Sequence, residues 1–174
     1  MNRESIHRYP SSMAIFHGLV ALVMVSTLVI GWLLDDNEGL MALHKSLGVT
    51  VLLLVTLRIV NRWRMRRALP ASVNPAGSLQ FTAEKAVHGL LYLSMFGIPL
   101  LGWLKSNAAG HPASCFGLFD LPTLVGRDHG LSHLLGQAHS LAATGFALLL
   151  GLHILGALAH RVIHKENIFK RIMP

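Results

Sequence analysis

The stretch GQAHSLAATGFALLLGLHILGALAH, residues 136–160, decides the fold because it is long and apolar enough to cross a bilayer. A hydrocarbon core of about 30 Å requires roughly 20 residues of helix. Three histidines interrupt the run, and two of them, His139 and His153, lie fourteen residues apart. Ionisable side chains are rare in membrane helices and tend to mark functional sites. The stretch therefore predicts a transmembrane helix with a functional site built into it.

Three further apolar stretches of similar length precede it. Of the 174 residues, 52% are apolar and only 13% are charged, which is typical of a membrane protein. In the second stretch, Lys45 and Arg58 lie near the ends, where long side chains reach the interface. We expect an all-α fold, a transmembrane four-helix up-down bundle, because short connections favour antiparallel neighbours. The chain, 1–174, is read as a single membrane-integral domain without an obvious internal repeat, with helices over about 12–34, 42–61, 84–105 and 132–163.

The positive charge of the chain follows the expected topology. Twelve of the fifteen Lys and Arg residues lie at the N-terminus, in or beside the connection between the second and third helices, or in the tail. The other two connections hold five of the eight acidic residues. This is the positive-inside pattern of a multi-pass protein of the bacterial inner membrane with both termini cytoplasmic. A nucleic-acid-binding face would not alternate with every apolar span, so we expect lipid and no nucleic acid as a partner.

Two features of the sequence exclude other readings. The first apolar run, 13–34, is long and has no clear small-residue cleavage site, so we expect a helix and not a removable signal peptide. The single cysteine, Cys115, excludes an internal disulfide and a thiolate zinc cluster. We expect Cys115 to be an inert packing residue.

The expected helices carry histidines at two depths. In an antiparallel bundle His17 lies near the inner face, whereas His44 lies near the outer face. The last helix supplies His139 at the outer level and His153 at the inner level. Fourteen residues span about 21 Å of helix and fall about 40° short of four full turns, so both imidazoles share one face. The expected pairs are His17 with His153, and His44 with His139.

Two facing imidazoles are the two axial ligands that a haem iron requires, and bundle cores commonly hold cofactors in this way. Zinc usually takes four donors at one place, and neither level offers a carboxylate or a thiolate. An iron with two imidazoles has no open position, which favours electron transfer over gas binding. For any single membrane histidine, the alternative is a hydrogen bond between helices. Glycines near the expected ligands would admit a flat macrocycle or serve ordinary helix packing; these are Gly18, Gly48, Gly136, Gly151 and Gly156.

Four further side chains are candidates for cofactor contacts. Lys45 and Lys105 lie at the outer level, where they would meet haem propionates or anchor the helices at the interface. His88 lies at the inner level, as a contact for a propionate or a quinone carbonyl or as a bridge between helices. His160 lies near the inner surface, where it would donate to a quinone carbonyl or simply be solvated.

Several stretches together resemble the bacterial cytochrome b561 family of dihaem membrane proteins. They are FHGLVALVM (16–24), LHKSLGVTVLLLVTLRIV (43–60), HGLLYLSMFGIPLLGW (88–103), SCFGLFDLP (114–122) and HILGALAHRVIHKENIFKRIMP (153–174). The resemblance implies two haem b groups, with no catalytic side chain, and electron exchange with ubiquinone. It implies axial iron ligation by His17, His44, His139 and His153. The chain departs from the family at Gly18, where Trp is frequent, and at Arg161, where a second histidine is frequent.

We therefore expect a dihaem b-type cytochrome that carries electrons between ubiquinone and a partner or small reductant. One form of this function is a superoxide:ubiquinone oxidoreductase. The alternative is a haem b electron-transfer subunit of a dehydrogenase or hydrogenase complex, which serves a periplasmic or membrane redox partner. A third reading, a histidine-lined metal permease, predicts no haem and transport that depends on His88 and His160.

Overall fold

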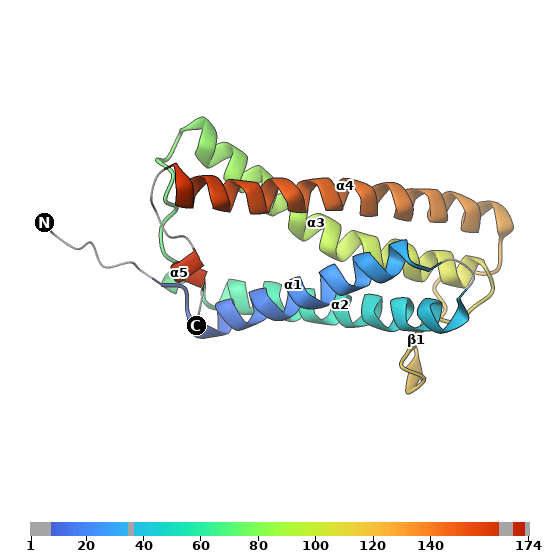
Figure 1. The fold of residues 1–174 in the computed structure, drawn as a ribbon. Coiled ribbons are helices and arrows are strands. Elements are labelled where there is room, and N and C mark those ends of the chain that lie inside the picture. Colours follow the sequence, from blue (N-terminus) through green and yellow to red (C-terminus); the bar gives the residue numbers. More distant parts are fainter. Residues whose placement is uncertain (1–7, 35–36, 164–168, 173–174) are drawn as a thin grey trace, which may run out of the picture.

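A computed structural model of the chain describes residues 8–34, 37–163 and 169–172. Within these ranges the chain forms four long helices, each long and apolar enough to cross a membrane (Figure 1). They are α1 (Ser11–Trp32), α2 (Glu38–Arg64), α3 (Leu79–Ala108) and α4 (His129–Val162). The shorter elements are η1 (Arg66–Ala68), β1 (Ser114–Cys115), β2 (Phe119–Asp120) and α5 (Phe169–Ile172). The predicted all-α, four-helix transmembrane bundle is confirmed.

Polar caps set where three of the helices begin. The side chains of Asn37, Ser78 and Asp128 each accept a hydrogen bond from the backbone N–H three residues further on, at 2.9–3.1 Å. Such N-caps satisfy donors that a helix leaves without partners at its start. Because the caps precede the apolar runs, α3 and α4 begin at residues 79 and 129, several residues before hydropathy alone predicted.

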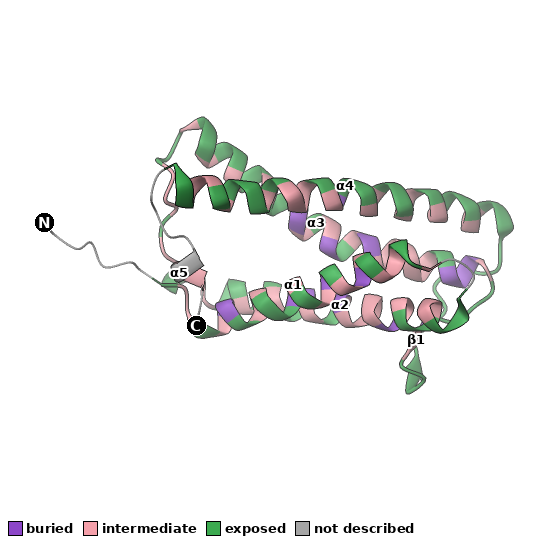
Figure 2. Ribbon diagram, in the orientation of Figure 1, coloured by how far each residue is buried: buried purple, intermediate pink, exposed green. Residues whose placement is uncertain are grey.

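The helices pack in sequence order, α1 on α2, α2 on α3 and α3 on α4. Within the described part of the chain, α1 and α4 have no comparably extensive contact. The buried residues gather on the inner faces of α1, α2 and α3, and α4 contributes only Phe146 to them (Figure 2). Outward-facing leucines such as Leu22, Leu93 and Leu148 are 67–70% exposed, as expected of surfaces that face lipid.

One end of the bundle gathers the start of α1, the 65–78 connection and α5 (left in Figure 1). There the N–H of Tyr9 donates to the carbonyl of Arg171 at 2.9 Å, and a guanidinium nitrogen of Arg171 donates to the carbonyl of Ala71 at 2.8 Å. The opposite end carries the start of α2 and the 109–128 connection. The chain therefore runs up and down through the bundle.

The 109–128 connection contains a small hairpin that α2 holds in place. Strands β1 and β2 are antiparallel, and the turn between them is closed by left-handed backbone at Phe116 (φ 51°) and Gly117 (φ 68°). The hydroxyl of Ser46, two residues after His44, accepts the N–H of Phe116 at 2.8 Å. This bond ties the hairpin to the same turn of α2 that carries the outer histidine.

Candidate functional site

The structure brings together both histidine pairs that the sequence predicted. The ring centroids of His44 on α2 and His139 on α4 lie 6.0 Å apart. Those of His17 on α1 and His153 on α4 lie 6.5 Å apart. The first pair lies toward the end that carries the hairpin, and the second toward the end where α1 begins. Helix α4 thus supplies one imidazole to each of two levels.

These separations fit an ion held between two imidazoles. Metal–nitrogen bonds of about 2 Å on each side, with each ring centroid about 1 Å behind its nitrogen, place the centroids roughly 6 Å apart. Both pairs meet this requirement. Among the described residues, no group of three or more His, Cys, Asp or Glu side chains converges as a metal site. The donor sets therefore suit the two axial positions of a haem iron and not a four-donor zinc site.

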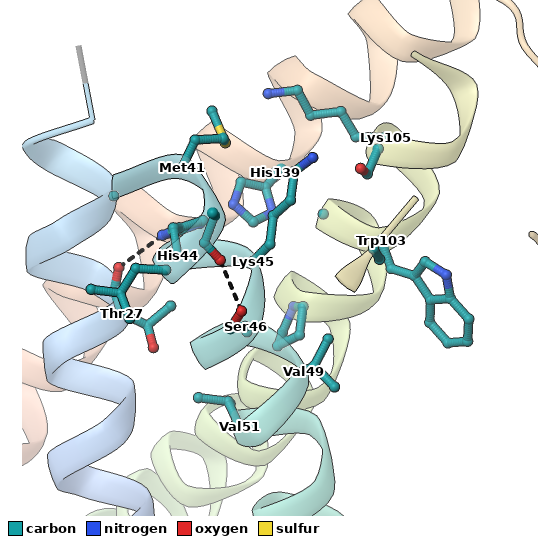
Figure 3. A pocket seen from close by; sticks show the side chains of 18 of the residues that line it. Thr27, Met41, His44, Lys45, Ser46, Val49, Val51, Trp103, Lys105 and His139 are labelled. Carbon is teal, nitrogen blue, oxygen red and sulfur yellow. Dashed lines mark hydrogen bonds between the residues drawn. The ribbon is translucent and has the colours of Figure 1, made fainter. Parts of the chain in front are cut away.

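The outer pair is oriented by hydrogen bonds to backbone carbonyls. Nδ1 of His44 lies 3.1 Å from the carbonyl oxygen of Thr27, and Nδ1 of His139 lies 2.9 Å from that of Ile98 (Figure 3 shows the first). A carbonyl only accepts, so each Nδ1 carries the proton and each Nε2 keeps its lone pair. Metal-binding histidines characteristically donate their second nitrogen in this way.

A glycine makes room for each of these rings. Gly31 follows Thr27 by one helical turn, and a Cβ there would lie 3.0 Å from Cε1 of His44. Gly102 follows Ile98 by the same turn, and a Cβ there would lie 3.1 Å from Cε1 of His139. Helices α1 and α3 therefore accommodate an imidazole in the same way: a carbonyl accepts its Nδ1 proton, and a glycine four residues later leaves space for the ring. The sequence analysis missed these two glycines, and of the five that it named, only Gly136 has a neighbour within 4 Å of an added Cβ.

A cavity of about 1160 Å³ surrounds the outer pair. This exceeds the roughly 300–1000 Å³ of most small-molecule sites. Both imidazoles line it together with Lys45 and Lys105, and residues of the 109–128 connection line it too. The two lysines thus lie where the sequence analysis expected contacts to a bound group (Figure 3). His111, to which the sequence analysis gave no role, also lines the cavity.

His88 lies beside the inner pair without completing it. Its ring centroid is 5.1 Å from that of His153, which is shorter than the roughly 6 Å that two imidazoles on opposite sides of one ion require. Its Nδ1 lies 2.7 Å from the carbonyl oxygen of Glu84, one turn earlier in α3. His160, the other inner candidate, is half-buried on α4 two turns beyond His153. His88 therefore contacts the ring of His153 and is not one of the two facing imidazoles of the inner level.

All four helices share one seven-residue register. Because seven residues nearly complete two helical turns, positions seven apart stack on one face. The outer level holds Gly31, His44, Gly102 and His139, and the inner level holds His17, Arg58, His88 and His153. Midway between them lie Met24, Val51, Met95 and Phe146, all of them buried. An apolar layer with one side chain from each helix thus separates the two levels.

This register exposes an internal repeat that the sequence analysis did not find. HGLVALVMVSTLVIGWL (17–33) and HGLLYLSMFGIPLLGWL (88–104) are identical at eight of 17 positions. They lie in α1 and α3, and they equate His17 with His88. In α2 and α4, Arg58 and His153 each follow the outer histidine by fourteen residues. The expectation of no repeat was wrong because the two halves differ in connection length, which hides the correspondence.

Comparison with known proteins gives a consistent result over nearly the whole chain. Residues 8–174 match the family model described as prokaryotic cytochrome b561. The chain is 30% identical over 173 residues to "Cytochrome b561 homolog 2" of Escherichia coli (strain K12), covering 95% of this chain and 91% of that one. It is 28% identical over 132 residues to "Probable superoxide oxidase CybB" of Yersinia pestis, covering 76% and 73%. A second Escherichia coli protein, "Cytochrome b561 homolog 1", is 26% identical over 158 residues, covering 89% and 88%.

Proposed function

Because the chain belongs to the prokaryotic cytochrome b561 family, a family of membrane electron-transfer proteins with b-type haem, we propose that it carries electrons between ubiquinone and a second redox partner through two such haems. It is a multi-pass protein of the prokaryotic inner membrane. The observation that carries the proposal is the presence of two imidazole pairs, at 6.0 and 6.5 Å, on opposite sides of an apolar layer.

We assign the outer axial positions to His44 and His139 and the inner ones to His17 and His153. A haem b held in this way supplies one-electron exchange with no coordination position open to a small ligand. The chain's own contribution is to hold the imidazoles still. The carbonyls of Thr27 on α1 and Ile98 on α3 accept the Nδ1 protons of the outer rings. This keeps both rings in the tautomer that leaves Nε2 available. A fixed ligand geometry keeps the structural change small when the charge of the site changes.

The distribution of charge supports an orientation with both termini cytoplasmic. The end that carries α5 holds eight cations with described side chains, namely Arg8, Arg62, Arg64, Arg66, Arg67, Lys85, Arg161 and Arg171. The opposite end holds Glu38, Asp120 and Asp128 beside Lys45, Lys105 and Arg127, so its described charges balance. By the positive-inside rule, the basic end faces the cytoplasm. The His44–His139 level then lies toward the periplasm, and ubiquinone would meet the inner half, with His88 and His160 as candidate contacts.

Superoxide is the electron donor that we favour at the outer level. Lys45 and Lys105 line the outer cavity and would attract a small anion. The similarity to the Yersinia pestis protein, whose name is "Probable superoxide oxidase CybB", supports the same choice. A second candidate is an electron-transfer subunit of a dehydrogenase or hydrogenase complex. Its support is the outer hairpin, in which Leu118 is 81% and Phe119 is 55% exposed, as a partner-binding surface would be.

The reduced-minus-oxidised visible spectrum of the purified protein tests the haem assignment. We expect two low-spin b haems per chain, and one in each of the His139→Ala and His17→Ala variants. His88→Ala is the matched control on the inner level, and it should keep both haems because its ring lies too close to that of His153 for the two to be opposite ligands of one iron. A protein without haem, or a haem ratio that neither ligand variant changes, would contradict the proposal.

The two candidate donors differ in what the isolated protein does. As a superoxide oxidase, the purified chain should reduce added ubiquinone when superoxide is generated, at a rate that falls with salt because screening weakens anion attraction. Lys45→Gln should slow this reaction several-fold, whereas Lys85→Gln, at the opposite end, should not. A chain that carries both haems but does not react with superoxide favours the subunit role.

A further inference from the structure

Arg58 occupies the fourth corner of the inner level. It lies on α2 fourteen residues after His44, the position at which α4 carries His153 after His139. In the common seven-residue register it shares the level of His17 and His153, and its side chain is half-buried there. A permanent positive charge therefore lies at the level of the two inner imidazoles.

Nothing in the described part of the chain neutralises this charge. The Nε atom of Arg58 is buried and has no hydrogen-bond partner there, and no carboxylate lies within ion-pair distance of the side chain in the described ranges. Glu84, the one described acid of the inner half, accepts hydrogen bonds from Ser72 and Asn74 instead. Leaving a guanidinium unpaired away from water costs several kcal/mol, so such groups are normally matched by an anion.

The neighbouring arginine, Arg62, is better placed than Arg58 to contact lipid. Arg58 and Arg62 both lie over the ring of Tyr92, with their guanidinium carbons 5.3 and 6.0 Å from the ring centroid. Arg62 is one turn closer to the basic end and is exposed, so it is the one placed to reach lipid phosphates. Arg58 is half-buried at the level of the histidines. Tyr92 covers a face of its guanidinium and leaves the donor edge available.

We propose that Arg58 binds a carboxylate of the group held between His17 and His153, which makes it the anion-binding corner of the inner site. On the proposed function, on which this inference rests, that carboxylate is a haem propionate. A guanidinium binds carboxylate through two parallel hydrogen bonds, which would fix the rotation of the group about the axis through the two imidazoles. A lipid phosphate offers similar chemistry, so the experiment separates the two sources.

Redox titration of the purified holoprotein in neutral detergent tests this assignment. Arg58→Gln should shift the midpoint potential of the inner haem to a lower value and leave the outer one unchanged, because a lost positive charge favours the ferric form. Arg58→Lys keeps the charge and should shift it much less. Arg62→Gln removes a charge from the same stacked pair and should shift neither haem. With ¹³C-labelled propionates, carboxylate bands in the redox difference infrared spectrum should change in Arg58→Gln alone.

Each outcome has one meaning. Loss of the inner haem alone in Arg58→Gln supports the assignment as well, since the propionate contact then holds the group in place. Two haems with unchanged potentials and unchanged carboxylate bands in Arg58→Gln would overturn it. An effect that appears only in nanodiscs containing phosphatidylglycerol, and disappears in neutral detergent, would assign the anion to lipid and overturn it too. Absence of haem from the wild-type protein would contradict the proposed function instead.

Discussion

At the scale of single residues, the outer site depends on two missing side chains. Gly31 and Gly102 lie on the helices that neighbour the histidines, and each lies one turn after the carbonyl that accepts the imidazole proton. The histidine of the same helix is fourteen residues away from each glycine, so the sequence of one helix alone does not indicate a role for Gly31 or Gly102. Only the packing of α1 on α2 and of α3 on α4 shows what they do.

Gly102→Ala should therefore damage the outer haem site selectively. The new methyl group would lie 3.1 Å from Cε1 and 3.3 Å from Nδ1 of His139, so the ring must move away from the carbonyl of Ile98. Overpacking of this kind costs about 1–3 kcal/mol. We expect a loss of about one haem per chain, or a shifted spectrum of one haem, in the reduced-minus-oxidised difference.

Gly97→Ala is the matched control for this prediction. It lies on the same helix, and an added Cβ there has no neighbour within 4 Å. The control should retain both haems with unchanged spectra. Equal behaviour of the two variants would show that space at Gly102 does not matter to the outer site.

At the scale of elements, the hydroxyl of Ser46 ties the outer hairpin to α2. Ser46 is 4% exposed, and its Oγ accepts the N–H of Phe116 while lying 3.4 Å from the carbonyl of Ser114. The hairpin therefore has a fixed attachment to α2 close to His44. Short strands of this kind are only marginally stable without such support.

Ser46→Ala should loosen the hairpin without disturbing the helices. Leaving the Phe116 N–H without its partner costs about 1–3 kcal/mol. We expect faster amide hydrogen exchange over residues 114–120 by roughly tenfold or more, and unchanged exchange in the centre of α2. Thr56→Val is the control because the Thr56 hydroxyl bonds only within its own helix, to the carbonyl of Leu52. Unchanged exchange of the hairpin in Ser46→Ala would contradict its role as the attachment.

The elements differ in how far the sequence alone could predict them. The spans follow from apolar runs, and the imidazole pairs follow from the fourteen-residue spacing of His139 and His153 in one helix. The hairpin does not follow, because SCFGLFDLP lacks the alternation of a strand and owes its shape to Ser46, distant in sequence. Read along α2 alone, Arg58 resembles an interfacial anchor. Its relation to the site emerges only when α2 is aligned with α4, where the equivalent position is His153.

At the scale of the whole molecule, the bundle consists of two similar helix pairs in a common register. Each pair offers a glycine and a histidine at the outer level and a histidine with a second polar side chain at the inner level. The pairs differ in the side chain that follows the outer histidine by fourteen residues, which is Arg58 in one and His153 in the other. The two similar halves thus differ at the inner level, where one half supplies a guanidinium and the other an imidazole.

Helix α4 contributes one buried side chain to the core, and it lies in the apolar layer between these levels. Phe146 is 3% exposed and is the one buried residue of α4, and it joins the core cluster formed by residues of α1, α2 and α3. Phe146→Ala would leave a cavity there and should lower the free energy of unfolding by about 3 kcal/mol, the lower end of the range for such truncations. The lower end applies because packing contacts, and not water exclusion, hold membrane helices together.

Thermal or detergent-induced unfolding of the holoprotein measures this change, with Leu148→Ala as its control. Leu148 lies two residues further along α4 and is 70% exposed on the lipid side, so its truncation should alter stability by well under 1 kcal/mol. Both variants should keep two haems, because neither residue lies at a histidine level. Similar unfolding of Phe146→Ala and Leu148→Ala would mean that the central layer does not hold α4. In that case the two haems, each bound by one histidine of α4 and one of α1 or α2, would hold α4 in place.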